Sequence, residues 1–149
     1  MTGVQTCALP ISLLHGPELL IIDEPTTGVD PVSRVELWRL ITRAADGGTA
    51  VVVSTTYVNE AARAACVVLL EAGAVVRSGS PDDILHGIPG VFGTALSVAR
   101  PAPLSWRRGA AWRVWAPSGR LPEGVSPAEP DFNDAVVAAS LAGEREGRA

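Results

Sequence analysis

The chain has 149 residues, of which 47% are apolar and 19% charged, so it carries enough apolar side chains to form a packed core. Its net charge of −4 argues against a nucleic-acid-binding surface, and no apolar run reaches the length of a membrane-spanning helix. The two cysteines, Cys7 and Cys66, indicate neither a disulfide framework nor a metal site.

Residues 1–12 differ in character from the rest of the chain. The run MTGVQTCALPIS resembles the conceptual translation of a common short-read sequencing adapter, and we interpret it as a non-native leader. A divergent N-terminus is the alternative. A signal peptide fits poorly, because the run has neither a basic start nor an adequate apolar core. Resequencing the locus distinguishes the two interpretations.

Residues 13–86 alternate between strand and helix patterns. Leu19–Ile22 is a continuous apolar run, which predicts a parallel strand buried on both faces. Asp30 and Pro31 are expected to begin a helix that runs to about Ala45, where Gly47 follows. Further along the chain we expect a buried parallel strand, a helix, a strand pair and a short helix capped by Ser80, at 50–54, 57–65, 67–70 with 74–77, and 82–85. This order predicts an α/β fold with crossover helices.

Two carboxylates stand where the first predicted strand ends. Asp23 and Glu24 follow Ile22 directly, at the edge where open α/β sheets bind ligands. One carboxylate can hold Mg²⁺, and the other can polarise a water for attack on a phosphate. An apolar run before Asp-Glu also occurs at ordinary strand ends, so the residues that follow, Thr26–Pro31, carry much of the argument.

The run from Leu19 to Pro31 resembles the Walker B and D-loop segments of ABC-transporter ATPases, in the branch that drives drug and ABC-2 type exporters. The resemblance implies ATP and Mg²⁺ as cofactors, with Asp23 as the metal ligand and Glu24 as the general base. It implies that Asp30 lies at the contact with a second nucleotide-binding domain, since two such domains sandwich ATP in this family. The other implied partner is a membrane permease, and no nucleic acid is expected.

The segment Val53–Ala61 resembles the switch segment of the same family, with a change at its key position. The family usually has His where this chain has Thr56, and that His contacts the γ-phosphate. A threonine can donate one hydrogen bond but cannot become cationic. A second departure is Ala65-Cys66, where the family usually has Asp-Arg. We interpret Thr56 as a degenerate catalytic position with weakened hydrolysis; the alternative is a simple hydroxyl at a strand end.

Two family motifs do not occur in the sequence. There is no G-x-x-x-x-G-K-[ST] phosphate loop, which would hold the phosphates, and no Ser-Gly-Gly signature before Leu19. Residues 13–86 therefore resemble the C-terminal half of the nucleotide-binding domain. The expected fold class is α/β: an incomplete P-loop nucleotidase core of parallel strands with crossover helices, followed by a small C-terminal α+β extension.

Residues 87–149 are expected to form this extension, with a Pro/Gly-rich linker and a terminal helix. Tryptophan and arginine are interleaved in it, a pattern that can bind single-stranded nucleic acid. A short strand at 111–115 with packed tryptophans and snorkelling Arg113 is the preferred interpretation. The segment Glu129–Val137 resembles the helix that closes many exporter ATPases, with Phe132 and Asp134 at matching positions.

The sequence thus favours an ATP-binding component of an ABC exporter, truncated before the Walker B motif and inactive as this chain. It would be cytoplasmic and peripheral, held at the inner face of the cell membrane by the permease. The alternative is a regulatory half of a paired ABC ATPase that binds nucleotide without hydrolysing it.

Overall fold

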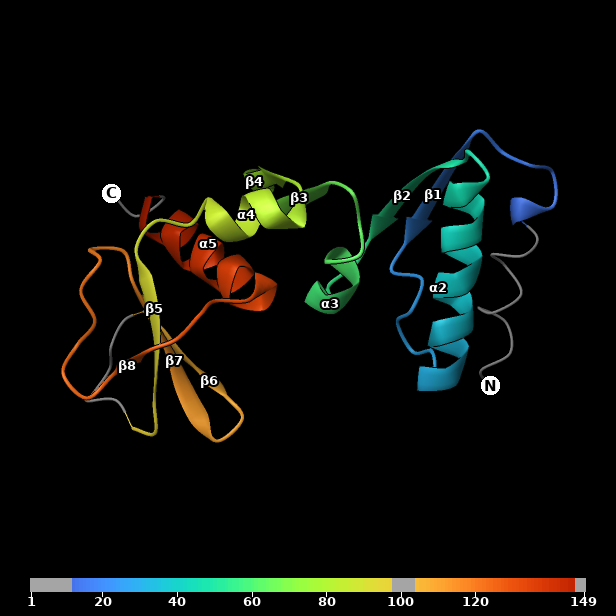
Figure 1. Cartoon of the computed structure of the whole chain (residues 1–149). Coiled ribbons are helices and arrows are strands. Elements are labelled where there is room, and N and C mark those ends of the chain that lie inside the picture. The colour runs from blue at the N-terminus through green and yellow to red at the C-terminus, as the bar shows by residue number, and fades with distance from the viewer. Residues whose placement is uncertain (1–11, 98–103, 147–149) are drawn as a thin grey trace. The chain divides into compact units, whose positions relative to one another are not determined.

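The computed structural model describes residues 12–97 and 104–146, so the predicted leader at 1–12 lies almost wholly outside the described residues. The chain divides into two compact units, Met1–Tyr57 and Val58–Ala149, each with its own core. The predicted domain boundary between residues 86 and 87 stays a prediction. Figure 1 shows the elements of each unit. The fold is mixed α/β with small sheets.

The first unit is a strand–helix–strand arrangement, with β1 (Leu19–Asp23), α2 (Pro31–Asp46) and β2 (Ala50–Ser54). The two strands pair in parallel with no register shift, from Leu19 opposite Ala50 to Asp23 opposite Ser54. In Figure 1, α2 runs alongside the strand pair. Leu20 of β1 packs with Leu37 and Ile41 of α2 in the core of this unit. The predicted parallel pair with a crossover helix is confirmed.

The prediction that these strands are buried on both faces was wrong. Leu19, Ile21 and Val52 are 53%, 71% and 54% exposed. Successive side chains of a strand point to opposite faces, and α2 covers only the face that carries Leu20. The apolar residues of the other face are therefore open to solvent.

Both ends of α2 follow the predicted capping. Asp30 has an extended backbone, and its carboxylate accepts hydrogen bonds from the amides of Val32 and Ser33 at 3.0 and 3.1 Å. Contacts with Ser33 and the amide of Val32 hold the pKa of Asp30 below its usual value, since they favour the charged form. Pro31 occupies the first turn, where its missing N–H costs nothing. The helix ends at Asp46, and Gly47 caps it.

The second unit begins with a helix that is much shorter than predicted. A helix was expected over residues 57–65, but α3 covers only Val58–Ala61. The amides of Arg63 and Ala64 bond three residues back rather than four, which tightens and ends the turn. Residues 62–66 are exposed, so the alanines there have no apolar face to bury, and helix propensity alone does not extend so short a helix.

A hairpin and a capped helix follow as predicted. Strands β3 (Val67–Glu71) and β4 (Ala74–Gly79) are antiparallel. Ala72 and Gly73 join them with φ angles of 48° and 81°, the left-handed pair that a two-residue hairpin turn uses. Helix α4 (Pro81–His86) begins with a capping box, in which Ser80 Oγ accepts from the amide of Asp83 and the Asp83 carboxylate accepts from the amide of Ser80.

The remaining elements form an antiparallel sheet and a helix. The strands are β5 (Val91–Ala95), β6 (Ser105–Arg108), β7 (Ala111–Ala116) and β8 (Ser126–Pro127), in the order β6-β7-β5-β8. Helix α5 (Phe132–Glu146) packs its buried alanines, Ala135, Ala138 and Ala139, into the core of this unit. The predicted strand at 111–115 and the predicted terminal helix are both present. Among the described residues, no helix has the length and apolar character to cross a membrane.

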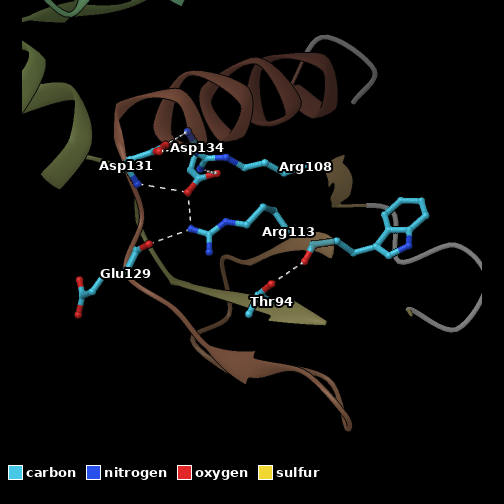
Figure 2. A network of polar contacts seen from close by, with 7 residues as sticks. Thr94, Arg108, Arg113, Glu129, Asp131 and Asp134 are labelled. Atoms are coloured by element: carbon cyan, nitrogen blue, oxygen red, sulfur yellow. Dashed lines mark hydrogen bonds and ion pairs between the residues drawn. The ribbon is translucent and has the colours of Figure 1, made fainter. Parts of the chain in front are cut away.

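An ionic network holds α5 against the sheet, as Figure 2 shows. Asp134 is completely buried and pairs with Arg113 of β7 and, at 3.2 Å, with Arg108 of β6. Arg108 also pairs with Asp131, and Arg113 donates to the carbonyl of Glu129 at 2.9 Å. The prediction that Arg113 snorkels to solvent was wrong: the residue is only 8% exposed, because its guanidinium has a buried carboxylate as partner.

Candidate functional site

The two predicted site carboxylates lie at the C-terminal end of β1. Asp23 is the last residue of the strand, and Glu24 begins the loop to α2. Glu24 has a φ of 45°, in the left-handed region that non-glycine residues seldom adopt. Backbone strain of this kind is common at functional sites. Because of this left-handed backbone, the Glu24 side chain does not continue the alternation of side chains between the two faces of β1.

Ser54, the last residue of β2, contacts both carboxylate residues. It lies opposite Asp23 in the parallel ladder, and its hydroxyl donates to Asp23 Oδ1. The amide of Glu24 donates to the Ser54 carbonyl at 3.1 Å and to the Ser54 hydroxyl at 3.2 Å. Ser54 therefore links the ends of the two strands through three hydrogen bonds.

The Glu24 carboxylate accepts hydrogen bonds from two threonines. Thr27 Oγ1 lies 2.9 Å and Thr56 Oγ1 3.5 Å from Glu24 Oε2. The structure thus brings Thr56 to Glu24. Thr27 was not singled out from the sequence. Its position three residues after Glu24 is the sequence signal that could have identified it. In the structure, the Thr27 amide donates to the Glu24 carbonyl at 3.2 Å and closes the loop.

The other predicted site residue, Asp30, makes different contacts. Its carboxylate caps α2, as described above, and takes part in none of the bonds that join Asp23, Glu24 and Ser54. Between Glu24 and Asp30, the loop is fixed at Thr26, which is fully buried. Arg34 Nη2 approaches the Thr26 carbonyl at 3.5 Å, and the Arg34 guanidinium lies 4.6 Å from the ring centre of Tyr57. These contacts hold the loop from Glu24 to Asp30 against α2.

The donor set suits Mg²⁺ but provides no phosphate cradle. Asp23 and Ser54 offer the hard oxygen atoms that Mg²⁺ prefers, and Mg²⁺ commonly takes only one or two protein carboxylates beside phosphate and water. Within residues 12–97 and 104–146, no three His, Cys, Asp or Glu side chains gather into a metal site. The chain contains no lysine, so it cannot supply the lysine of a phosphate loop.

Comparisons with known proteins give partial matches. The chain is 41% identical over 80 residues to the probable multidrug ABC transporter ATP-binding protein YbhF of Escherichia coli, covering 54% of this chain and 14% of that protein. It is 40% identical over 77 residues to the daunorubicin resistance ATP-binding protein DrrA3 of Streptomyces coeruleorubidus, 51% of this chain and 24% of that one. It is 34% identical over 82 residues to the Nod factor export ATP-binding protein I of Rhizobium etli, 53% of this chain and 25% of that one. No family model matches the chain.

These matches show partial homology, about 40% identity over about 80 residues, to ABC-transporter ATP-binding proteins of the drug-resistance and ABC-2 exporter type. The homology implies that the aligned segment is part of a P-loop nucleotidase fold. The aligned segment spans only a quarter or less of each of these three relatives.

Proposed function

We propose that this chain carries the metal-binding and water-activating half of an ATP-binding site, in the ATPase component of an ABC exporter. The observation that supports this most directly is the arrangement at the ends of β1 and β2. Asp23 ends one strand and Glu24 follows it, and Thr56, just past the end of the other strand, reaches Glu24 Oε2 at 3.5 Å. The partial homology to exporter ATP-binding proteins supports the same assignment.

Each residue has a distinct role in this proposal. Asp23 binds the Mg²⁺ that accompanies ATP and is held by the hydroxyl of Ser54. Glu24 acts as the general base for the attacking water, with its carboxylate oriented by Thr27 and Thr56. Mg²⁺, when bound, neutralises charge on the phosphates during hydrolysis. Asp30 fixes the start of α2 and, in the proposal, borders a second nucleotide-binding domain.

The phosphate cradle must come from residues other than these, because the chain has no phosphate loop and no lysine. We therefore propose that the 149-residue chain does not hydrolyse ATP by itself. In an active assembly the component would lie at the cytoplasmic face of the membrane, bound to a permease.

A second candidate is a regulatory site that binds nucleotide and does not turn it over. Thr56 favours it, because a hydroxyl at this position cannot carry the positive charge of a histidine beside the γ-phosphate. In this form, hydrolysis would occur at the site of a second, intact domain.

The test is to read the genomic DNA upstream of the codon for Leu13 and express any longer reading frame that continues into this chain. Steady-state phosphate release is measured for that protein and for its Glu24→Gln and Thr56→His variants. We expect Glu24→Gln to abolish turnover and Thr56→His to raise it, by less than the about hundredfold that one added donor can supply. Turnover that survives Glu24→Gln would refute the role of Glu24 as the base.

If Thr56→His leaves turnover unchanged while Mg-ATP still binds, the threonine is not what limits hydrolysis. Thr27→Ala tests the hydroxyl contacts without changing the switch position, because Thr27 also donates to Glu24 Oε2. Loss of turnover in Thr27→Ala with normal Mg-ATP binding would support the orienting role of the hydroxyls.

A further inference from the structure

Ser54, the last residue of β2, contacts both carboxylate residues of the site. It is the register partner of Asp23, so its side chain stands beside the Asp23 carboxylate at the same end of the sheet. Its hydroxyl donates to Asp23 Oδ1 and also lies 3.2 Å from the amide nitrogen of Glu24. One hydroxyl thus bonds to both residues that the proposed function depends on.

The two hydrogen bonds of this hydroxyl are chemically compatible. A serine hydroxyl has one proton to donate and lone pairs to accept. The proton is directed to the Asp23 carboxylate, which can only accept when ionised, and the lone pair takes the Glu24 amide, which can only donate. The direction of each bond is therefore determined by its partner.

The Glu24 amide also explains why this contact matters for the backbone. Glu24 leaves the β1 ladder with a φ of 45°, which places it outside regular strand geometry. Its N–H is shared between the carbonyl and the hydroxyl of Ser54, at 3.1 and 3.2 Å. A left-handed non-glycine residue persists only when its surroundings fix it, and Ser54 supplies two of the acceptors that do so.

We propose that Ser54 is a positioning residue that sets the Asp23 carboxylate in one rotamer and anchors the left-handed backbone of Glu24. This inference rests on the proposed function for its catalytic meaning, but the positioning itself is a property of this chain. A carboxylate offers about four lone-pair sites, so the bond from Ser54 to Oδ1 orients Asp23 and leaves capacity for a metal ion. A freely rotating Asp23 would hold that ion in no fixed place.

The experiment compares Ser54→Ala with Ser54→Thr in the 149-residue chain. Alanine removes the hydroxyl, whereas threonine keeps it on a side chain that suits a strand. Three-bond couplings from the Asp23 side-chain carboxyl carbon to the backbone nitrogen and carbonyl carbon report its χ1 rotamer, and the Glu24 amide–Hα coupling and amide exchange rate report the backbone. Ser78→Ala is the control, because it removes an exposed serine from a strand of the other unit, β4.

We expect one Asp23 rotamer in the wild-type chain and in Ser54→Thr and Ser78→Ala, and rotamer averaging with faster Glu24 amide exchange in Ser54→Ala. A single unchanged Asp23 rotamer in Ser54→Ala would overturn the inference, and so would averaging that Ser54→Thr fails to restore. Averaging already present in the wild-type chain would overturn it as well. Urea unfolding of each variant shows whether it is still folded. If Ser54→Ala is folded and its Asp23 rotamer is averaged, the averaging reflects lost positioning and not lost stability.

The outcome is independent of the proposed function. If the longer reading frame shows no hydrolysis, the ATPase assignment fails while the rotamer measurement still decides the role of Ser54. If hydrolysis is found, Ser54→Ala should raise the Mg²⁺ concentration needed for half-maximal rate several-fold, and Ser54→Thr should restore it.

Discussion

Replacing Asp134 by alanine should remove more stability from the second unit than any exposed charge substitution. The Asp134 side chain is 0% exposed, and its partner Arg113 is 10% exposed, so the pair is buried. Removal of one member leaves the other as an uncompensated buried charge, which typically costs about 3–5 kcal/mol. The bond from Arg113 to the Glu129 carbonyl satisfies one N–H but does not neutralise the charge.

The matched control is Asp131→Asn. Arg108 and Asp131 are 44% and 48% exposed, and asparagine keeps the acceptor for the Asp134 amide at 3.0 Å. Solvent screening limits such a pair to less than about 1 kcal/mol. A third variant, Arg113→Met with Asp134→Leu, removes both buried charges and should be more stable than Asp134→Ala alone.

The assay is urea unfolding followed by tryptophan fluorescence in a Trp38→Phe background. The three remaining tryptophans, Trp106, Trp112 and Trp115, all belong to the second unit, so the signal reports that unit. Equal m-values are required before the free energies of unfolding are compared. A cost below about 1 kcal/mol for Asp134→Ala, or one no greater than that of Asp131→Asn, would refute the argument from buried charge.

Four further predictions concern other features of the chain. Gly90→Ala should destabilise the second unit by at least about 2 kcal/mol in the same unfolding assay. Residue 90 has a φ of 100°, and the Cβ of an alanine there would lie 2.3 Å from the Ala116 carbonyl oxygen. The control is Gly109→Ala, which at φ 61° has nothing within 4 Å of the added Cβ and so carries only backbone strain. Equal destabilisation by the two variants would contradict this prediction. Ser80→Ala should cost about 1 kcal/mol through loss of the α4 cap, and Ser80→Thr should recover most of it; no difference between the two variants counts against the capping role. Burial alone would raise the pKa of Asp131, but the hydrogen bond from Arg108 and the amide of Asp134 hold it below its usual value. The stability that this carboxylate adds is therefore present above its unfolded pKa of about 3.9 and is lost as the pH falls through the lower folded pKa. The difference in free energy of unfolding between wild type and Asp131→Asn should shrink when the pH is lowered and should not shrink when it is raised. Finally, isothermal titration should detect no tight binding of Mg-ATP to the 149-residue chain, and a Kd of about 10 μM or tighter, about 7 kcal/mol, would contradict the view that the phosphate cradle lies elsewhere.

Local signals in the sequence were sufficient for the elements that depend on neighbouring residues. The caps at Asp30 and Ser80 and the strand pair at 67–70 with 74–77 were predicted, because each is fixed by a few adjacent side chains and backbone angles. The parallel pairing of β1 and β2 followed from their apolar runs and the helix pattern between them. The position of Asp23 and Glu24 at a strand end followed from the same apolar run, since Asp23 is the last residue of β1 and Glu24 comes directly after it.

The features that sequence reasoning missed depend on residues far apart in the chain. Arg113 was expected at the surface because arginine usually is, and its buried partner Asp134 lies 21 residues further on. Ser54 lies 31 residues from Asp23 and became visible only through the strand register. The helix predicted over 57–65 stopped at Ala61 because alanine content says nothing about whether a face is buried. Exposure of Ile21 reflects which faces are covered, which a strand pattern does not specify.

The docking of α5 combines a steric and an ionic constraint that can be read as a signature. Ala135, Ala138 and Ala139 are at most 1% exposed, so only methyl-sized side chains fit where the helix meets its core. Asp134, next to the first of them, fixes the rotation of the helix through its two arginines. A distant relative of this unit would therefore keep Asp-Ala-x-x-Ala-Ala in its last helix and an arginine on each of two neighbouring strands, even where overall identity has fallen too low to align.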